Sequence, residues 1–67
     1  MIIYLNETAK ECTDNLSLAQ FLKSEQLIEA SGIAVAVNQC VVSRADWETH
    51  LLQSEDKVLI IRATQGG

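Results

Sequence analysis

The sequence predicts an α+β fold in which one main helix packs on a small mixed sheet. Three observations indicate it: short runs of β-forming residues alternate with turn residues, one segment between them has helical spacing, and the final run is apolar at every position. The chain has 67 residues, 48% of them hydrophobic, which suits one domain with a small core. No repeat, linker or proline divides it.

The start of the chain predicts a hairpin. Residues 1–5 are rich in β-forming side chains, and Asn6-Glu7-Thr8 supplies turn chemistry. A second short strand is expected over residues 9–12. The first two strands should therefore be antiparallel neighbours.

A helix is predicted next, over about residues 18–25. Ser17 can cap it, Gln20 stands at the return position of a capping box, and Leu16 can contact Phe21 across the first turn. Its apolar residues share one face: Leu18, Phe21 and Leu22. A helix with one such face should cover a sheet.

A second hairpin follows the helix. Gly32 marks a bend before a strand over residues 33–37, and another short strand is expected over 40–42. Asn38-Gln39 lies between them, and Asn readily takes the positive φ that a tight hairpin turn requires.

The last third predicts a helical turn and a closing strand. Residues 43–46 read Ser-x-x-Asp, a helix start, and Trp47 and Leu51 are spaced to pin one turn against the core. Residues 54–56 form an acidic turn. Because residues 58–61 are continuously apolar, we expect them in the middle of the sheet with much of both faces covered.

Charge and hydropathy exclude several classes of protein. The net charge is −4 and the pI is near 4.6, which argues against nucleic-acid binding and suits a basic protein partner. The basic residues are scattered along the chain: Lys10, Lys23, Arg44, Lys57 and Arg62. No apolar stretch approaches the roughly 18 residues of a membrane span, and no charged leader precedes the first strand. A cytoplasmic protein is expected.

The cysteines and the histidine do not form a recognisable catalytic or metal site. Cys12 and Cys40 stand apart, without a CxxC or Cys/His quartet, and we expect two reduced thiols that pack as small apolar residues. The alternative is that one of them accepts a persulfide or acts as a redox switch. His50 has no carboxylate or serine at catalytic spacing, so a surface histidine is expected.

Gly66 and Gly67 end the sequence directly beyond the closing strand. Without Cβ atoms, such a pair can pass between close protein walls and bring a terminal carboxylate to a buried catalytic centre. A frayed terminus is the alternative. The expected organisation is a domain over residues 1–63 followed by a flexible diglycine tail over residues 64–67.

The order of elements is that of the β-grasp, ubiquitin-like fold, in which the first and last strands pair in parallel at the sheet centre. The residues resemble the ubiquitin-like sulfur carriers. The resemblance covers nearly the whole chain and is carried by these segments: 36–39, 42–47, Leu52 with 55–56, and 66–67. Arg44 followed by Trp47 is more similar to the thiamine-pathway ThiS branch than to the molybdopterin-pathway MoaD branch.

The resemblance implies a carrier that is a substrate of partner enzymes and not itself an enzyme. An E1-like adenylyltransferase (ThiF-like) would use ATP and Mg²⁺ to adenylate the Gly67 carboxylate, and a cysteine-persulfide donor would convert it to a thiocarboxylate. Thiazole synthase (ThiG-like) would receive the sulfur. No stably bound cofactor or metal is implied for the carrier.

The resemblance also assigns roles of reach and recognition. Gly67 would bear the cargo, while Gly66, Gln65 and Thr64 would thread the backbone, four residues spanning at most about 14 Å. Arg62 is the best basic candidate for a partner contact, together with an exposed sheet face and nearby acidic residues. Lys10, Lys23 and Lys57 should be solvated surface residues.

Arg44 and Trp47 are expected to have a structural role. Trp47 would pin the short helical turn, and Arg44 would pair with an acidic neighbour such as Asp46 or Glu48.

Other functions remain open at this point. A MoaD-like carrier would use the same terminal chemistry for molybdopterin synthesis, and a ubiquitin-like modifier would be joined through Gly67 to lysines of other proteins. A binding module would make no use of its glycines. An acyl carrier protein is disfavoured because Leu16, not Asp, precedes Ser17.

Overall fold

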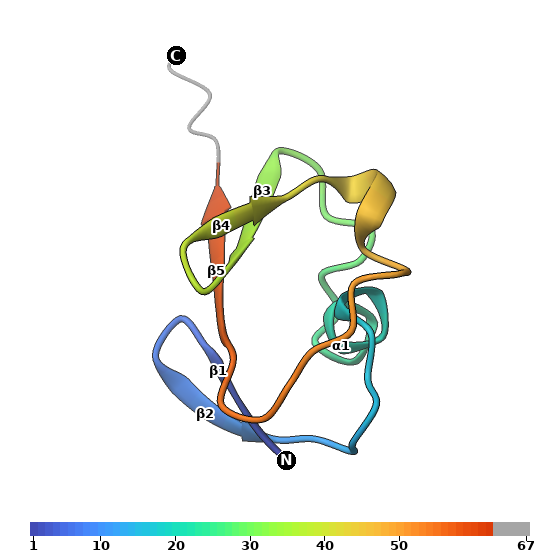
Figure 1. The fold of residues 1–67 in the computed structure, drawn as a ribbon. Helices are drawn as coiled ribbons and strands as arrows, with labels where there is room; N and C mark the ends of the chain where they lie inside the picture. Colours follow the sequence, from blue (N-terminus) through green and yellow to red (C-terminus); the bar gives the residue numbers. More distant parts are fainter. Residues whose placement is uncertain (63–67) are drawn as a thin grey trace.

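The computed structural model describes residues 1–62, and residues 63–67 lie outside the described part. A five-stranded mixed sheet is faced by one α-helix (Figure 1). The elements in chain order are β1 (Ile2–Leu5), β2 (Thr8–Glu11), α1 (Leu18–Ser24), β3 (Ile33–Val37), β4 (Cys40–Val42), the 3-10 helix η1 (Arg44–Asp46) and β5 (Lys57–Arg62). The predicted start of the tail, at Thr64, lies outside these residues.

The sheet has the strand order β2-β1-β5-β3-β4. Two antiparallel hairpins flank β5, which pairs in parallel with β1 and antiparallel with β3. The first and last strands therefore meet at the sheet centre, and the predicted β-grasp order is confirmed.

Both hairpins turn through two residues with positive φ. Asn6 and Glu7 have φ of 47° and 74°, and Asn38 and Gln39 have φ of 50° and 74°. Positive φ at both central positions is the geometry of a type I′ turn, whose twist matches that of the flanking strands. The turn predicted at Asn38-Gln39 is confirmed, and the first hairpin has the same type of turn.

The helix begins as its capping residues predict. The Ser17 hydroxyl accepts a hydrogen bond from the Gln20 backbone N–H at 3.1 Å, and the Gln20 Oε1 accepts one from the Ser17 N–H at 2.9 Å. This reciprocal capping box satisfies two donors that the first helical turn cannot use itself. The helix ends at Ser24, one residue before the predicted end.

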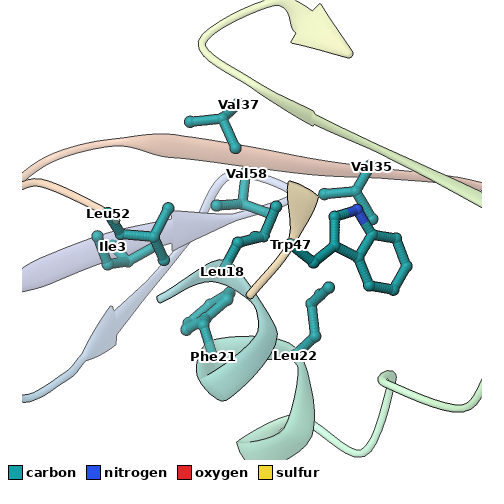
Figure 2. Packing of buried hydrophobic residues seen from close by; sticks show 9 residues of the cluster. All are labelled: Ile3, Leu18, Phe21, Leu22, Val35, Val37, Trp47, Leu52 and Val58. Atoms are coloured by element: carbon teal, nitrogen blue, oxygen red, sulfur yellow. The ribbon is translucent and has the colours of Figure 1, made fainter. Parts of the chain in front are cut away.

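A single core lies between α1 and one face of the sheet. Figure 2 shows its members converging from the helix, from three strands and from the segment that follows η1. They are Ile3, Leu18, Phe21, Leu22, Val35, Val37, Trp47, Leu52 and Val58. The three helical residues are the predicted face, and each is fully buried.

The prediction that Leu51 packs against the core is wrong. Its side chain is 61% exposed, whereas Leu52 is 3% exposed and belongs to the core. Four-residue spacing places Leu51 beneath Trp47 only if the helix continues, but η1 ends at Asp46. Leu51 instead forms an isolated antiparallel bridge with Ser17, and alternation along extended chain turns Leu52 inward.

The prediction that both faces of the closing strand are covered is also wrong. Val58 is buried by the helix layer, but Leu59 and Ile61 on the opposite face are 49% and 45% exposed. The only α-helix within residues 1–62 covers one side of the sheet. A continuous apolar run indicates a central strand, which is correct, but it does not say what covers the second face.

Candidate carrier platform and partner surface

The central strand β5 is the element that leads toward Gly67. Arg62 is its last residue and is exposed. The predicted cargo and threading residues, Gly67, Gly66, Gln65 and Thr64, lie outside the described residues. The described part of the site is therefore β5 and the surfaces beside it.

Two turn asparagines hold β5 from opposite edges. The Asn6 backbone N–H donates to the Val58 carbonyl at 2.9 Å, and its Oδ1 accepts from the Ile60 N–H at 2.9 Å. On the other edge, Asn38 donates its N–H to the Lys57 carbonyl at 2.8 Å and accepts the Lys57 N–H on Oδ1 at 2.9 Å. Each side-chain oxygen thus takes the place of a strand carbonyl where the neighbouring strand has already turned away.

A further contact fixes the second asparagine. Its Nδ2 donates to Asp56 Oδ1 at 3.0 Å, and Asp56 Oδ2 accepts the Gln53 N–H at 2.8 Å. The acidic turn before β5 is therefore tied to the second hairpin turn. These bonds give β5 a defined base on both sides.

The face of the sheet opposite α1 carries an apolar patch. Val41, Leu59 and Ile61, which we call the open-face patch, are 70%, 49% and 45% exposed. Ala36 lies in register between Leu59 and Val41, and its small side chain is only 4% exposed. Large apolar side chains gathered on one exposed face are typical of a surface that binds another protein.

An open groove of about 490 Å³ adjoins this patch beside the two hairpin turns. Its walls include Tyr4, Asn6, Glu7, Gln39, Lys57 and Leu59. Aromatic, apolar and charged side chains are thus available next to the patch. Lys57 is exposed here, as predicted for a surface lysine.

The structure corrects the prediction for Arg44. Its guanidinium does not pair with Asp46 or Glu48 but donates to the carbonyls of Ile28 at 3.1 Å and Ala30 at 2.9 Å. It also stacks 4.5 Å from the centroid of the Trp47 ring. The planar fork of arginine allows both contacts at once, which joins η1 to the loop that follows α1.

Trp47 has the pinning role that was predicted. Its ring is 3% exposed and its Nε1 donates to the Val42 carbonyl at 3.0 Å. The indole therefore fills the core while its one polar atom is satisfied.

The two cysteines are free thiols in different surroundings. Cys40 is exposed, so the prediction that it packs as a small apolar residue is wrong. Cys12 is half-buried, with its Sγ 3.7 Å from the Lys10 carbonyl. Burial, reinforced by the nearby Glu25 carboxylate, raises the pKa of the Cys12 thiol above its usual value. A protonated thiol is a poor nucleophile, which supports the packing role predicted for Cys12.

The remaining candidates add no catalytic group. His50 is half-buried, and its backbone carbonyl accepts the Leu18 N–H at 2.7 Å. Lys10 pairs with Glu25 at 3.4 Å and so is more than a solvated lysine. Among residues 1–62, no three His, Cys, Asp or Glu side chains form a group that could hold a metal ion. In the same part of the chain, every helix is too short or too polar to cross a membrane.

The five-stranded sheet and its single helix define a ubiquitin-like β-grasp protein. Solved structures agree with this fold. The chain superposes with a TM-score of 0.86 on the crystal structure of the thiamine biosynthesis protein ThiS from Geobacter metallireducens, at 19% identity and with all of both chains covered. The solution structure of a thiamine biosynthesis protein from the same organism gives a TM-score of 0.76 at 19% identity, covering all of this chain and 88% of the other.

Sequence comparison goes beyond the fold. The profile of the ThiS family matches residues 3–67. The chain is 34% identical over 68 aligned positions to the sulfur carrier protein ThiS of Escherichia coli strain K12, with both chains covered completely. This chain belongs to the ThiS family. The predicted resemblance is confirmed, and the thiamine-pathway branch is favoured over the molybdopterin-pathway branch.

Proposed function

We propose that this chain is a sulfur carrier of thiamine biosynthesis that carries sulfur as a thiocarboxylate on Gly67. The observation that supports it most is the full-length match to the ThiS family, which extends through Gly66-Gly67. In this proposal the chain is a substrate that partner enzymes load and unload, and it catalyses no step itself.

Loading requires activation because a carboxylate is a poor electrophile. A carboxylate oxygen of Gly67 attacks the α-phosphorus of ATP, and pyrophosphate leaves, which gives an acyl adenylate. Positioning and charge neutralisation by Mg²⁺ and basic groups govern such a reaction, and we assign these to an E1-like adenylyltransferase. The reaction consumes ATP, so we place the carrier in the cytoplasm.

Sulfur transfer then replaces one oxygen. The terminal sulfur of a cysteine persulfide attacks the Gly67 carbonyl carbon and AMP leaves, which gives an acyl disulfide. A second thiol attacks the donor sulfur of that disulfide, and the thiocarboxylate is released as a new disulfide forms on the donor. The thiocarboxylate then serves as the sulfur source for thiazole synthase.

The chain's own part is to present its terminus and to be recognised. Gly66, Gln65 and Thr64 would pass through a narrow channel, where Gly66 has no Cβ to clash. Arg62, the last residue of β5, and the open-face patch on the sheet would contact the partners. The net charge of −4 suits partners with a basic docking surface.

Intact mass spectrometry tests the proposal. The chain is incubated with ATP, Mg²⁺, a purified E1-like adenylyltransferase and a persulfide donor, and the mass should rise by the difference between sulfur and oxygen. The matched control lacks Gly66 and Gly67, should give the same circular dichroism spectrum, and should gain no mass.

Two results would contradict the proposal. Isopeptide-linked adducts in place of the mass shift would indicate a ubiquitin-like modifier. A mature polypeptide that continues past Gly67 in cells would remove the reactive carboxylate altogether.

A further inference from the structure

Among the described residues, one edge of β5 has no strand partner near the end of the strand. β1 is in register with β5 only at Tyr4–Lys57 and Leu5–Val58, whereas β3 accompanies β5 as far as Arg62. The even-numbered residues of β5 point their backbone groups toward the β1 side, as the Asn6 contacts with Val58 and Ile60 show. The Ile60 carbonyl and the Arg62 N–H therefore face this side, and neither has a partner among residues 1–62.

The start of this free edge is set by the first hairpin turn. β1 ends at Leu5, and Asn6-Glu7 reverses the chain, so no strand formed by residues 1–62 runs along this side of β5 beyond Val58. Within the described residues, Asn6 supplies the last contact on this side, through Oδ1 to the Ile60 N–H. An acceptor at Ile60 and a donor at Arg62 are spaced as one side of a strand ladder requires.

We propose that an extended segment of the activating enzyme pairs with this edge of β5, next to Asn6, when it binds the carrier. This inference rests on the proposed function and names how the partner recognises the carrier. Strand addition uses main-chain groups for affinity and adjacent side chains for specificity. A strand placed here would lie beside Ile61 of the open-face patch, so it would also cover exposed apolar surface.

The activating enzyme is the favoured occupant of this edge, because the residue on which it acts, Gly67, is close along the chain. Arg62 precedes Gly67 by five residues, so an active site that holds the Gly67 carboxyl lies within about 17 Å of the free edge. A second copy of the chain is disfavoured. Each copy carries a net charge of −4, and the edge offers one donor and one acceptor within the described residues.

Comparing proline with alanine at Arg62 distinguishes the contribution of the backbone N–H from that of the side chain. Arg62→Pro removes the N–H, and because that N–H points away from β3, no bond of the β3–β5 ladder is lost. Arg62→Ala removes the same side-chain charge but keeps the N–H. Ala9→Pro is the matched proline control, since Ala9 is exposed on the outer edge of β2 and its N–H points away from β1.

The readout is adenylation by the purified E1-like adenylyltransferase, measured as ATP–pyrophosphate exchange against carrier concentration. Relative to Arg62→Ala, Arg62→Pro should raise the KM for the carrier about three- to tenfold, which corresponds to one main-chain hydrogen bond. Ala9→Pro should match the parent chain. In the parent chain, hydrogen exchange of the Arg62 amide should slow on the order of tenfold or more when the enzyme is added.

The inference and the proposed function can fail separately. Equal KM values for Arg62→Pro and Arg62→Ala, with an Arg62 amide that exchanges as fast in the complex as in the free chain, would overturn strand addition while the carrier is still adenylated. Failure of the enzyme to adenylate the parent chain would refute the proposed function, and strand addition by that enzyme with it. Slowed exchange of the Arg62 amide at high carrier concentration without enzyme would identify a second copy as the occupant and overturn the inference.

Discussion

The same substitution at the two turn asparagines should have different effects, because their side chains use different atoms. Asn6→Asp keeps an oxygen that can accept the Ile60 N–H, and the Asn6 Nδ2 donates to no residue within 1–62. Asn38→Asp keeps the acceptor for the Lys57 N–H but replaces the Nδ2 donor to Asp56 with a second carboxylate oxygen. We therefore expect a neutral change at Asn6 and a destabilising one at Asn38.

The magnitude at Asn38 follows from two losses. The hydrogen bond to Asp56 contributes on the order of 1 kcal/mol, discounted because it is exposed. Two carboxylates held about 3 Å apart in water repel by about 1 kcal/mol, and the Gln53 N–H restrains Asp56 from rotating away. The sum is about 1–2 kcal/mol, from a total unfolding free energy of roughly 3–10 kcal/mol for a chain of this size.

Thermal unfolding followed by circular dichroism measures this difference. At pH 7 the Asn38→Asp variant should melt about 4–16 °C below the parent chain, while Asn6→Asp should stay within about 4 °C of it. Repulsion raises the affinity of the folded state for a proton, so protonation stabilises the folded variant relative to its unfolded chain. The deficit of Asn38→Asp should therefore shrink as the pH falls toward about 4.

A further variant separates the acceptor at Asn6 from its backbone geometry. Asn6→Gly tolerates the φ of 47° but has no oxygen for the Ile60 N–H, so it should lose about 1 kcal/mol. The reasoning is refuted if Asn6→Asp and Asn38→Asp destabilise equally, or if the Asn38→Asp deficit is the same at both pH values.

The other predictions concern the corrected positions and the thiols. Leu52→Ala should lower the free energy of unfolding in urea by about 2–4 kcal/mol, because Leu52 is 3% exposed. Leu51→Ala should change it by less than about 0.5 kcal/mol. Equal losses would contradict the assigned orientations. Arg44→Ala should lower the free energy of unfolding by about 1–2 kcal/mol in the same assay. Arg44→Lys should restore less than half of that loss, because lysine lacks the planar fork. Full restoration by lysine would mean that charge alone matters. An alkylating reagent followed by mass spectrometry should modify exposed Cys40 first, and Cys12, whose pKa is raised by burial, should react only as the pH increases; a Cys12 that reacts first at pH 7 would contradict this.

Local sequence signals predicted the parts of the fold that local chemistry determines. The capping box at Ser17 and Gln20 and the positive φ at Asn38 each depend on residues within a few positions of one another, and both are present. The cap and the turn need no knowledge of what packs against them. The parallel pairing of β1 with β5 was expected instead from the order of elements, which is that of the β-grasp fold and is permitted by the rule for parallel connections.

The predictions that failed depend on distant parts of the chain. Arg44 binds carbonyls of Ile28 and Ala30, which lie in a stretch without a clear pattern. Leu51 faces outward because an extended bridge to Ser17 replaces the helical turn that its spacing suggested. No residue near either position signals these contacts, since both arise only when the segments meet in the folded chain.

The exposed face of β5 links the fold to its function. The core does not require apolar residues at positions 59 and 61, since only the helix-facing side of β5 contributes to it. Keeping apolar side chains there costs solubility without stabilising the isolated domain. The same strand leads toward Gly67 and carries the Ile60 carbonyl and the Arg62 N–H, which have no partner within the described part of the chain. Under the proposed function, this apolar face and this edge have one explanation: the enzymes that load and unload the carrier cover them when they bind.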